Sequence, residues 1–421
     1  MTFNPLIYDK TGQAIKEAIT AGATGLSKTL EAQLRKQNAL LEVIARDSTK
    51  ALANDWAGVQ QLTRDGFAPE IFDYGDKFID VWKDVAAENK EYNFPWRVNH
   101  FDNIELENGE TLPAMFIQAH FASPFGVQFS QCQAFYYAEE GLPAGTYHLT
   151  NNDVTWGDNC KPGSYSFTLT QPVPKGGKLA GFKYMPDQKM ETWQVSSYDA
   201  DSKTIIETVS VISGALGTKL GDWPRYYSGE GNINGIQRTA YGHNRWATSA
   251  IRQYLNSDKG KGEWWTPQSK FDIAPTELAT KAGFLTGLPE GLKAILKPVK
   301  VVTYCNTVDG DDKAQGSDIT YDKVFLPSLE QMYAKVQIAG EGNVHEYWKR
   351  VAGTSEPIEW YKPFPAYIHY GADNNTSACY FRLRSAYRGY SYNTWYVYAS
   401  GGVTSNGASS SNRFAPLVAI C

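Results

Sequence analysis

The stretch that decides the fold of this chain is YRGYSYNTWYVYASGGVTSNGASSSN, residues 387–412. Tyr, Ser, Gly and Asn make up 18 of its 26 residues, and its only charged side chain is Arg388. Tyrosine supplies large, fairly rigid contact area, while Ser, Asn and Gly supply adaptable hydrogen bonding, and antibody paratopes have this composition. Disordered polar and aromatic tails also have it, so the order of the residues must distinguish a binding surface from a tail.

Alternation within this stretch favours an ordered strand. Apolar and hydroxylated side chains alternate through residues 395–400, as in a half-buried strand. A three-residue loop at residues 400–402, with glycine in the left-handed conformation, would return the chain at Val403 opposite Ala399. This register pairs Tyr398 with Thr404 and Tyr396 with Asn406 on one exposed face.

Length and charge limit the class of protein. A chain of 421 residues predicts two or three domains with an ample core. The net charge of -5 and the pI near 5.8 give no basic surface for nucleic acid, and no run of like charges indicates a membrane surface. No stretch of 18 apolar residues is present, and MTFNPLIYDK lacks the features of a secretion signal, so we expect synthesis in the cytoplasm without membrane insertion.

Cysteine and histidine spacing predicts neither a metal nor a cofactor. An odd number of scattered cysteines suits neither a disulfide framework nor a zinc site, so we expect buried free thiols. HEYWK at His345 lacks the second histidine that a zincin motif needs. The acidic run at residues 309–312 lacks the ligand alternation of a calcium loop and predicts a solvated turn. The cysteines are Cys132, Cys160, Cys305, Cys379 and Cys421, and the histidines are His100, His120, His148, His243, His345 and His369.

The N-terminal region, residues 1–94, is expected to be helical and to serve attachment or oligomerisation. Residues 13–55 are rich in helix formers and contain no proline. This segment is either a coiled-coil strand or an amphipathic helix packed on its own domain. A second helical segment is expected at residues 77–91. A 3.5-residue repeat runs through Leu30, Leu34, Gln37, Leu41, Ile44 and Ser48.

The rest of the chain predicts a mixed α+β protein with two further domains. Residues 95–222 contain short β-prone runs separated by turns, which predicts an antiparallel β-sandwich. Residues 223–421 mix short helices with strands, which predicts a compact α+β domain. We expect one helix within residues 244–257 and another from Ser328, where Ser328 and Gln331 match a capping box.

Several runs of the third region carry a family resemblance. They are AYGHNRWATSAIRQYLNS (240–257), GEWWTP (262–267), ITYDKVFLPSLEQMY (319–333) and the final run from RLRSAYRGY to RFAPLVAIC (382–421). In order and spacing they resemble retroelement-diversified variable proteins with a C-type lectin fold, of which phage major tropism determinants are the best-known kind. The resemblance covers residues 225–421, about half of the chain.

The resemblance implies a fixed framework that carries a variable surface. A reverse transcriptase would rewrite adenine-rich codons in the last segment, which accounts for its Tyr, Ser and Asn content. The resemblance leaves Arg388 and Trp395 unassigned. Framework roles fall on Arg384, Ser385, Ala386, Val397, Ala408, Pro416 and Ile420. Ligand-binding roles on the variable face fall on Tyr387, Tyr390, Tyr392, Asn393, Tyr396, Tyr398, Thr404, Asn406 and Ser410.

From these features we expect a display protein of a phage or prophage particle. It would sit on the tail or capsid surface of the virion, for instance in a tail fibre, and bind a host-surface protein or glycan as a homotrimer beside other virion proteins. The alternative is a structural virion component, such as a capsid decoration or baseplate protein. An oxidase of the formylglycine-generating type shares the fold, but it needs a reactive thiol, and Cys379 and Cys421 are the only candidates near that end, so we expect no enzyme.

Overall fold

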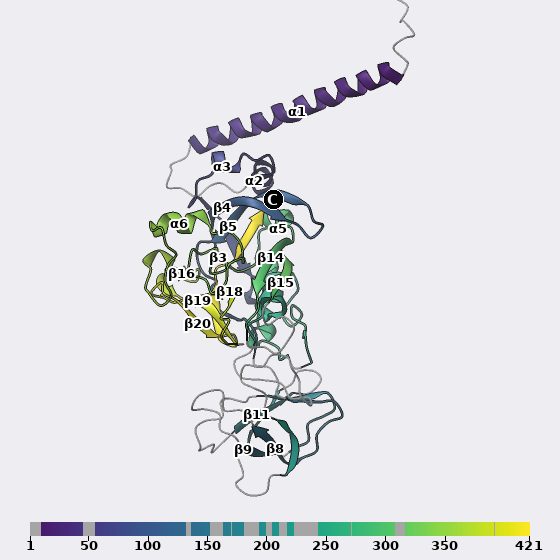
Figure 1. The fold of residues 1–421 in the computed structure, drawn as a ribbon, viewed down its shortest axis with the longest axis vertical. Helices are drawn as coiled ribbons and strands as arrows, with labels where there is room; N and C mark the ends of the chain where they lie inside the picture. The colour runs from purple at the N-terminus through teal and green to yellow at the C-terminus, as the bar shows by residue number, and fades with distance from the viewer. Residues whose placement is uncertain are drawn as a thin grey trace, which may run out of the picture.

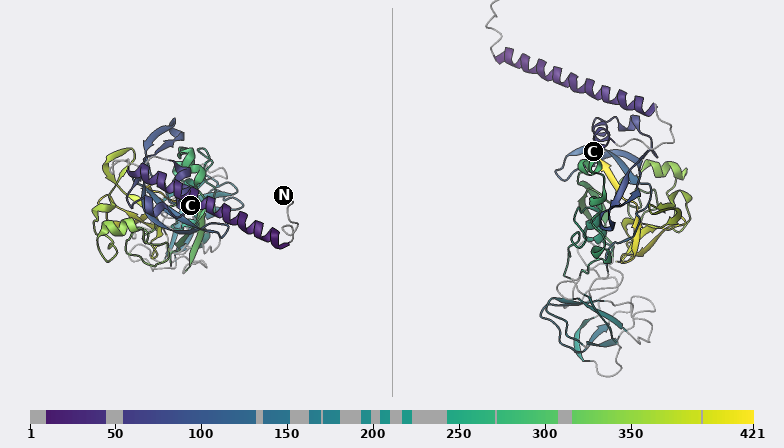
Figure 2. Two further views of the ribbon diagram at one scale, coloured as in Figure 1. Left: turned by 90° about the horizontal axis from the view of Figure 1, so that it is seen from above. Right: turned by 180° about the vertical axis from the view of Figure 1, so that it is seen from behind.

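The computed structural model describes residues 10–44, 55–131, 136–151, 163–169, 171–180, 193–198, 204–209, 217–222, 243–270, 272–307, 316–390 and 392–421. Figure 1 shows a long helix at one end, a mixed α/β body in the middle and a separate group of strands at the other end. The view from behind in Figure 2 shows the same order of parts. Helices and strands both contribute substantially, so the expected mixed α+β class is confirmed.

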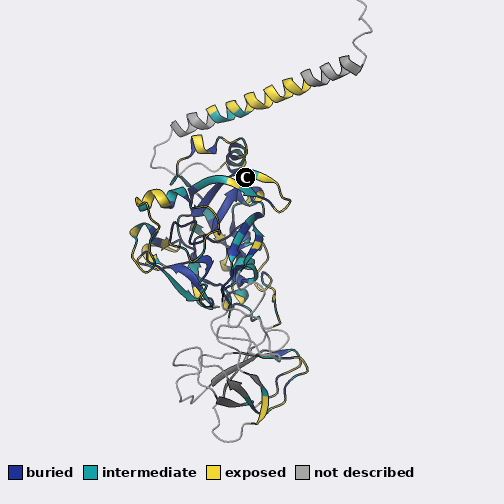
Figure 3. Cartoon of the chain, in the orientation of Figure 1, coloured by how far each residue is buried: buried dark blue, intermediate teal, exposed yellow. Residues whose placement is uncertain are grey.

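The N-terminal segment forms one long helix and two short ones. α1 spans Lys10–Ile44, α2 spans Trp56–Arg64 and α3 spans Ala68–Ile71. An ion pair between Arg35 and Asp65, 2.8 Å, joins α1 to the residue after α2. The side chains of α1 that the structure describes are largely exposed, as the yellow part of the helix in Figure 3 shows. Ser48 of the predicted repeat and the side chains of Leu41 and Ile44 lie outside the described part of the chain.

The helix that we expected at residues 77–91 is wrong. This segment forms β1 at Lys77–Phe78, β2 at Val81–Asp84, the 3-10 turn η2 at Val85–Ala87 and β3 at Lys90–Asn93. Glu88 and Asn89 adopt left-handed φ angles of 56° and 60°, which close the β2–β3 hairpin and are incompatible with a continuous helix. The indole of Trp82 stacks on Phe284 at 5.6 Å, so tertiary packing overrides the local helix preference.

Two sheets make up the body, and each combines strands from both ends of the chain. In the first sheet the order is β1-β4-β5-β22, all antiparallel. In the second sheet the order is β20-β19-β18-β21-β6, in which β18 and β21 are parallel. The strands of the first sheet that follow β1 are β4 at Trp96–Glu105, β5 at Thr111–Ala119 and β22 at Leu417–Ile420. Those of the second are β6 at Val127–Gln128, β18 at Phe381–Ala386, β19 at Asn393–Val397, β20 at Val403–Gly407 and β21 at Ser411–Phe414.

Short helices and hairpins cover these sheets. The remaining helices of the body are α4 at Ala250–Leu255, α5 at Glu290–Ile295 and α6 at Glu346–Ala352, with 3-10 turns η4 at Trp246–Thr248, η5 at Thr276–Ala279, η6 at Phe284–Gly287 and η7 at Pro365–Tyr367. The hairpins pair β14 at Val299–Tyr304 with β15 at Ser317–Asp322 and β16 at His369–Gly371 with β17 at Asn374–Cys379. One buried hydrophobic cluster runs from Trp56 to Cys421 and includes residues of both sheets.

The boundary that we expected between residues 222 and 223 does not separate the folded units. β4, β5 and β6 precede this boundary, yet they pair with β22 and β21 from the end of the chain. Only the strands from β7 to β13 lie apart from the body in Figure 1. The described strands from β7 to β13 therefore form an insertion into one body domain, which the sequence order of the strands concealed.

The inserted part contains two small sheets. Their orders are β12-β11-β10-β7 and β13-β8-β9. The expected strands are present, but β13 pairs with β8 in parallel, so the wholly antiparallel sandwich that we expected is wrong. The strands are β7 at Tyr136–Ala138, β8 at Gly145–Asn151, β9 at Gly163–Leu169, β10 at Gly177–Ala180, β11 at Trp193–Tyr198, β12 at Thr204–Val209 and β13 at Thr218–Asp222.

The two helices expected in the third region have different outcomes. Residues 244–257 contain η4 and α4, and α4 buries Ala250, Ile251, Tyr254 and Leu255 as its apolar spacing predicted. Ser328 begins only a turn. Its capping-box bonds form, since the Ser328 amide donates to Gln331 Oε1 and the Gln331 amide donates to Ser328 Oγ, both at 3.1 Å. The left-handed φ of 56° at Tyr333 ends the turn before a helix can develop.

Replacing residues 132–242 with a short Gly/Ser linker should leave the body folded. Phe129 and Ala250 already meet, because the Ala250 amide donates to the Phe129 carbonyl at 2.8 Å, so a short linker spans the gap. We expect one cooperative thermal transition, with a Tm within about 4 °C of the body transition of the full chain. A fragment of residues 243–421 lacks β4, β5 and β6 and should show no cooperative transition by calorimetry. Independent folding of that fragment would contradict the single-body assignment.

Candidate ligand-binding face

The tyrosine-rich stretch forms the hairpin of β19 and β20. Val397 pairs with Val403 and Tyr396 with Thr404, so the connecting loop is residues 398–402. The register that we expected, with Ala399 opposite Val403, is therefore wrong by two residues. The Tyr398 amide donates to the Gly402 carbonyl at 2.8 Å and closes a longer loop. Because the shift is an even number, every side chain stays on the predicted face.

Glycine is required at one position of this loop. Gly401 has a φ of 84°, in the left-handed region, as the sequence predicted for this turn. A Cβ atom there would lie 2.1 Å from the carbonyl oxygen of Phe364. The amide of Tyr361 also donates to the Val403 carbonyl at 2.8 Å, so residues 361–364 pack along the outer edge of β20.

One face of the hairpin packs into the core. Trp395, Val397 and Val403 are fully buried in a hydrophobic cluster that also holds Trp348 and Phe381. Trp395 packs against Trp360, with ring centroids 4.7 Å apart, and its indole donates to Gln337 at 3.1 Å. Trp395, one of the two residues that the resemblance left unassigned, is therefore a core residue.

The other face carries an exposed cluster of tyrosine rings. Tyr398 is 48% exposed and Tyr380 is 43% exposed, and their rings stack with centroids 5.9 Å apart. The ring centroid of Tyr396 is 6.1 Å from that of Tyr380 and 6.2 Å from that of Tyr398, so the three rings form a triangle, and Tyr396 is only 9% exposed. Thr404 lies directly across from Tyr396, and Asn406 lies two residues further along β20, opposite Thr394. We call this set the tyrosine face, and its members are Tyr380, Tyr396, Tyr398, Thr404 and Asn406.

The nine predicted ligand-binding residues do not form one surface. Tyr396, Tyr398, Thr404 and Asn406 belong to the tyrosine face, and the Ser410 hydroxyl contacts Asn406 Oδ1 at 3.3 Å. Tyr387 packs instead against Trp395, at 5.1 Å, with Tyr390 beside it at 5.0 Å. Tyr392 is 8% exposed, and its ring meets Tyr390 at 5.6 Å. Asn393 contacts Ser405 at 3.5 Å, and strand alternation places both on the side of Trp395.

A buried arginine lies on the same side of the sheet as the tyrosine face and holds the backbone there. Arg382 of β18 lies opposite Tyr396 in the strand register and is fully buried. Its guanidinium donates to the carbonyls of Asn406, Gly407 and Ser410 at 3.0–3.1 Å and to the hydroxyl of Thr394. Burial lowers the pKa of Arg382 to about 9, yet the side chain remains charged at neutral pH. Arg382 thus fixes the backbone that presents the exposed side chains.

A buried asparagine holds the neighbouring loop of residues 387–393. The Asn244 amide nitrogen donates to the carbonyls of Tyr390 at 2.6 Å and Asn393 at 2.7 Å, and more weakly to Tyr387 at 3.3 Å. Its oxygen accepts from the Asn306 amide at 2.9 Å. Asn244 is fully buried. A residue far away in sequence therefore sets the shape of this loop.

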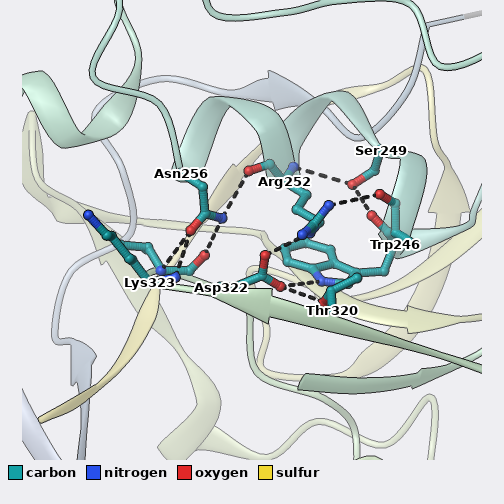
Figure 4. Close-up of polar contacts among 9 residues, drawn as sticks. Trp246, Ser249, Arg252, Asn256, Thr320, Asp322 and Lys323 are labelled. Atoms are coloured by element: carbon teal, nitrogen blue, oxygen red, sulfur yellow. Dashed lines mark hydrogen bonds and ion pairs between the residues drawn. The ribbon is translucent and has the colours of Figure 1, made fainter. Parts of the chain in front are cut away.

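The run containing Asn244 is itself anchored to β15 through the carboxylate of Asp322 (Figure 4). This fully buried group accepts from the Trp246 indole at 3.0 Å, Arg252 Nε at 2.7 Å and the Thr320 hydroxyl at 2.7 Å. Asn256 accepts from the amides of residues 323 and 324 and so secures the end of α4. The two recognised runs NRWATSAIRQYLNS and ITYDKV are therefore halves of one polar network.

The predicted framework positions all lie in the interior. Arg384, Ser385, Ala386, Val397, Ala408, Pro416 and Ile420 are buried. Arg388 is half-buried, and its guanidinium donates to the Cys305 carbonyl at 2.8 Å. Sequence reasoning missed Tyr380, Arg382 and Asn244. The signal for Arg382 was present, because an arginine between Phe381 and Leu383 in a strand buried on both faces needs internal acceptors.

Neither Cys379 nor Cys421 lies in an environment that favours a thiolate. Burial raises the pKa of Cys379 to about 11 and raises that of Cys421, so both stay protonated, which is the reverse of what a thiolate catalyst requires. Within the described residues no group of three His, Cys, Asp or Glu side chains is arranged to hold a metal ion. The acidic run at residues 309–312, and Cys132 and Cys160, lie outside that part of the chain.

A second concave region lies between β4, β14 and residues 340–343. This cavity of about 260 Å³ is lined by His100, Glu341 and His345, among others. Its polar groups are largely bonded to the protein, since Glu341 accepts from the Tyr304 amide at 2.9 Å and from the Ser385 hydroxyl. His345 precedes α6 and stacks on His100, with centroids 5.3 Å apart. Burial lowers the pKa of His345 well below its usual range.

Comparison with known proteins places the chain in one family. Residues 202–419 match the family model described as a domain of unknown function, DUF6273, and this match covers more than half of the chain. The chain therefore belongs to the DUF6273 family. No curated protein and no solved structure matches it. In the described residues, no helix combines the length and the apolar character needed to span a bilayer.

Substituting Asn244 with alanine should loosen the loop of residues 387–393. Three carbonyls lose their buried donor, and we expect the free energy of unfolding to fall by about 2–3 kcal/mol. Hydrogen exchange of amides in residues 387–393 should accelerate more than exchange in β4 or β5. The exposed Asn375→Ala is the control and should change stability by less than about 0.5 kcal/mol. Unchanged exchange in the loop would contradict the positioning role of Asn244.

Proposed function

We propose that this DUF6273 protein is a ligand-binding display protein of a phage or prophage particle. Its tyrosine face binds a receptor on the host surface, either a protein or a glycan, and the body carries that face as a C-type-lectin-like domain. The observation that carries the proposal is a pair of exposed tyrosines, Tyr398 in the loop of the β19–β20 hairpin and Tyr380 directly before β18, beside a hairpin whose backbone is held by Arg382. Aromatic rings on a rigid support bind with little loss of conformational freedom.

Diversification by a retroelement is part of the same proposal. Variable positions need side chains that change without disturbing the fold, and Tyr398 and Thr404 meet this condition because they are exposed or half-exposed on the hairpin. The bonds that hold the hairpin use backbone carbonyls of Asn406, Gly407 and Ser410, so they survive a change of side chain there. Tyr396 is the exception, because its ring is nearly buried and its replacement would disturb packing.

The N-terminal helix supports a homotrimeric assembly. At about 100° per residue, Leu26, Leu30 and Leu34 fall on one stripe of α1, while Arg35 and Lys36 lie on the opposite side. The leucines are 58–63% exposed, and Arg35 and Lys36 form ion pairs with Asp65 and Glu70 of the body. One side of α1 therefore docks on its own body and the leucine stripe stays available to other copies. Three linked faces would multiply weak single contacts by roughly 10² or more.

A structural virion component, such as a decoration or baseplate protein, is the second candidate. The same leucine stripe favours it, because an exposed apolar helix also suits docking on another virion protein. The position of the protein in electron micrographs of particles separates the two candidates. A decoration protein occupies capsid lattice points, whereas a receptor binder is placed at the tail.

Removing the two exposed tyrosines should abolish adsorption to cells without unfolding the protein. Fluorescently labelled protein is mixed with intact cells of a panel of bacterial strains and adsorption is counted by flow cytometry. We expect at least one strain to be labelled, and Tyr380→Ala with Tyr398→Ala to weaken labelling by about 30-fold or more, as loss of a binding hot spot does. Tm should change little, since both rings are nearly half exposed.

The matched control for this experiment is Tyr321→Ala, a half-exposed tyrosine on β15 outside the tyrosine face. It should leave labelling unchanged. Labelling that survives the double substitution would show that the tyrosine face is not the binding site. A wild-type protein that labels no strain of the panel would contradict host adhesion.

Placing lysines on the leucine stripe should dissociate the trimer. We expect a light-scattering mass of three times the 46.8 kDa chain for the wild type, and a single-chain mass for Leu30→Lys with Leu34→Lys. Charged residues at core positions of a coiled coil prevent the helices from packing. Thr24→Lys with Thr29→Lys adds the same charge away from the stripe and should leave the mass unchanged. A wild-type mass equal to one chain would refute the trimer.

A further inference from the structure

Charge is unevenly distributed in this protein. Residues 380–421 contain four arginines and no Asp, Glu or Lys, although the chain as a whole has a net charge of -5. These residues carry most of the tyrosine face. The segment that forms the proposed ligand-binding surface therefore has basic side chains and no acidic ones.

Two of the four arginines are compensated by acids. Arg413 pairs with Asp373, with Nη2 3.1 Å from Oδ2. Arg384 lies in the field of Glu341 and Asp322 and donates to the carbonyl oxygens of Leu326 and Glu341. Neither of these side chains therefore adds much positive potential to the surface.

Arg382 has no such compensation. Among the described residues it forms no ion pair, and its contacts are a threonine hydroxyl and three backbone carbonyls. The Nε atom is buried and has no acceptor there. Because water is excluded around it, the charge is weakly screened and acts over a longer distance than a surface charge. Its strand partner Tyr396 lies beside it on the same face of the sheet.

Arg388, at the other end of the hairpin, is a second arginine without a carboxylate partner in the part of the chain that the structure describes. Its guanidinium lies over the Tyr304 ring at 5.6 Å and donates to a carbonyl, and no carboxylate of the described residues pairs with it. Arg382 is paired with Tyr396, and Arg388 lies in the loop before Asn393, so about three strand residues, roughly 10 Å, separate the two charges along β19. Two charges at this spacing can attract more than one carboxylate of a polymer.

We propose that the tyrosine face binds an acidic polysaccharide, with uronate-type carboxylates held in the field of Arg382 and Arg388 and sugar rings packed on Tyr380 and Tyr398. This inference rests on the proposed function and names its ligand class. A carboxylate does not touch Arg382, which is a positioning residue. The ligand carboxylate accepts hydrogen bonds from the hydroxyls of the tyrosine face. The buried charge of Arg382 stabilises it from a distance.

The geometry favours a polysaccharide over an acidic peptide. An extended peptide would bind most readily by adding a strand to the edge of the sheet. The Val403 end of the β20 edge is already occupied, because the Tyr361 amide bonds to the Val403 carbonyl and the Phe364 carbonyl lies close to Gly401. The face itself offers ring surfaces, hydroxyls and one amide, which match the apolar ring faces and hydroxyls of sugars.

The test compares three polymers on the full-length protein by biolayer interferometry. Immobilised polygalacturonate carries free carboxylates, fully methyl-esterified polygalacturonate has the same backbone without charge, and poly-glutamate is an acidic peptide. We expect binding to polygalacturonate only, with affinity falling at least tenfold from 50 to 500 mM salt. Arg388→Gln should weaken binding about fivefold at 50 mM salt and make little difference at 500 mM. Arg350→Gln, an exposed arginine on α6, is the control.

The outcomes of the polymer-binding test separate the acidic-polysaccharide assignment from the proposed function. Equal binding of the esterified polymer, or tighter binding of poly-glutamate, overturns the acidic-polysaccharide assignment. Binding to polygalacturonate that survives Tyr380→Ala with Tyr398→Ala shows that the acid binds elsewhere. Binding to none of the three polymers, by a protein that still labels cells through the tyrosine face, overturns the ligand class and leaves the proposed function standing.

Discussion

The pairing of β22 with β5 is the constraint on which the rest of the body depends. Residues 417–420 bond to residues 115–118, so the last strand of the chain enters a sheet begun some 300 residues earlier. Gln60 of α2 donates to the carbonyl of Cys421 at 2.6 Å and holds the very end. Once β22 is placed, β21 must lie beside β18 and β6, and the hairpin of β19 and β20 follows.

This closure explains why the body needs two distant parts of the sequence. The family match begins at residue 202, after β4, β5 and β6, and so omits strands that pair with its own C-terminal strands. A boundary drawn from sequence alone falls in the wrong place, because the inserted strands of residues 136–222 resemble the body strands in composition. Long-range pairing, which has no local signal, decides which strands belong together.

The hairpin shows what local sequence can and cannot predict. Alternation of Trp395 and Val397 with Tyr396 and Tyr398 fixed the two faces correctly, because side-chain direction depends only on the strand period. The register was wrong by two residues, and the loop that replaces the expected one packs closely against residues 361–364, which the local sequence of the hairpin does not reveal. The segment at residues 77–91 failed for the same reason, since the packing of Trp82 on Phe284 is a tertiary contact.

The buried polar groups hold segments of the fold in place, while other side chains form the exposed surface. Asp322, Asn244 and Arg382 bond largely to backbone or to framework side chains, and each fixes a segment without using the side chains that the segment exposes. Leaving Arg382 without a carboxylate costs stability, because a buried charge is stabilised less by carbonyl dipoles than by an ion pair with full hydrogen bonding. A methionine of similar size would avoid that cost but would release three carbonyls beneath the tyrosine face. The arginine is therefore the side chain that keeps a variable surface rigid, and its charge is available to whatever binds above it.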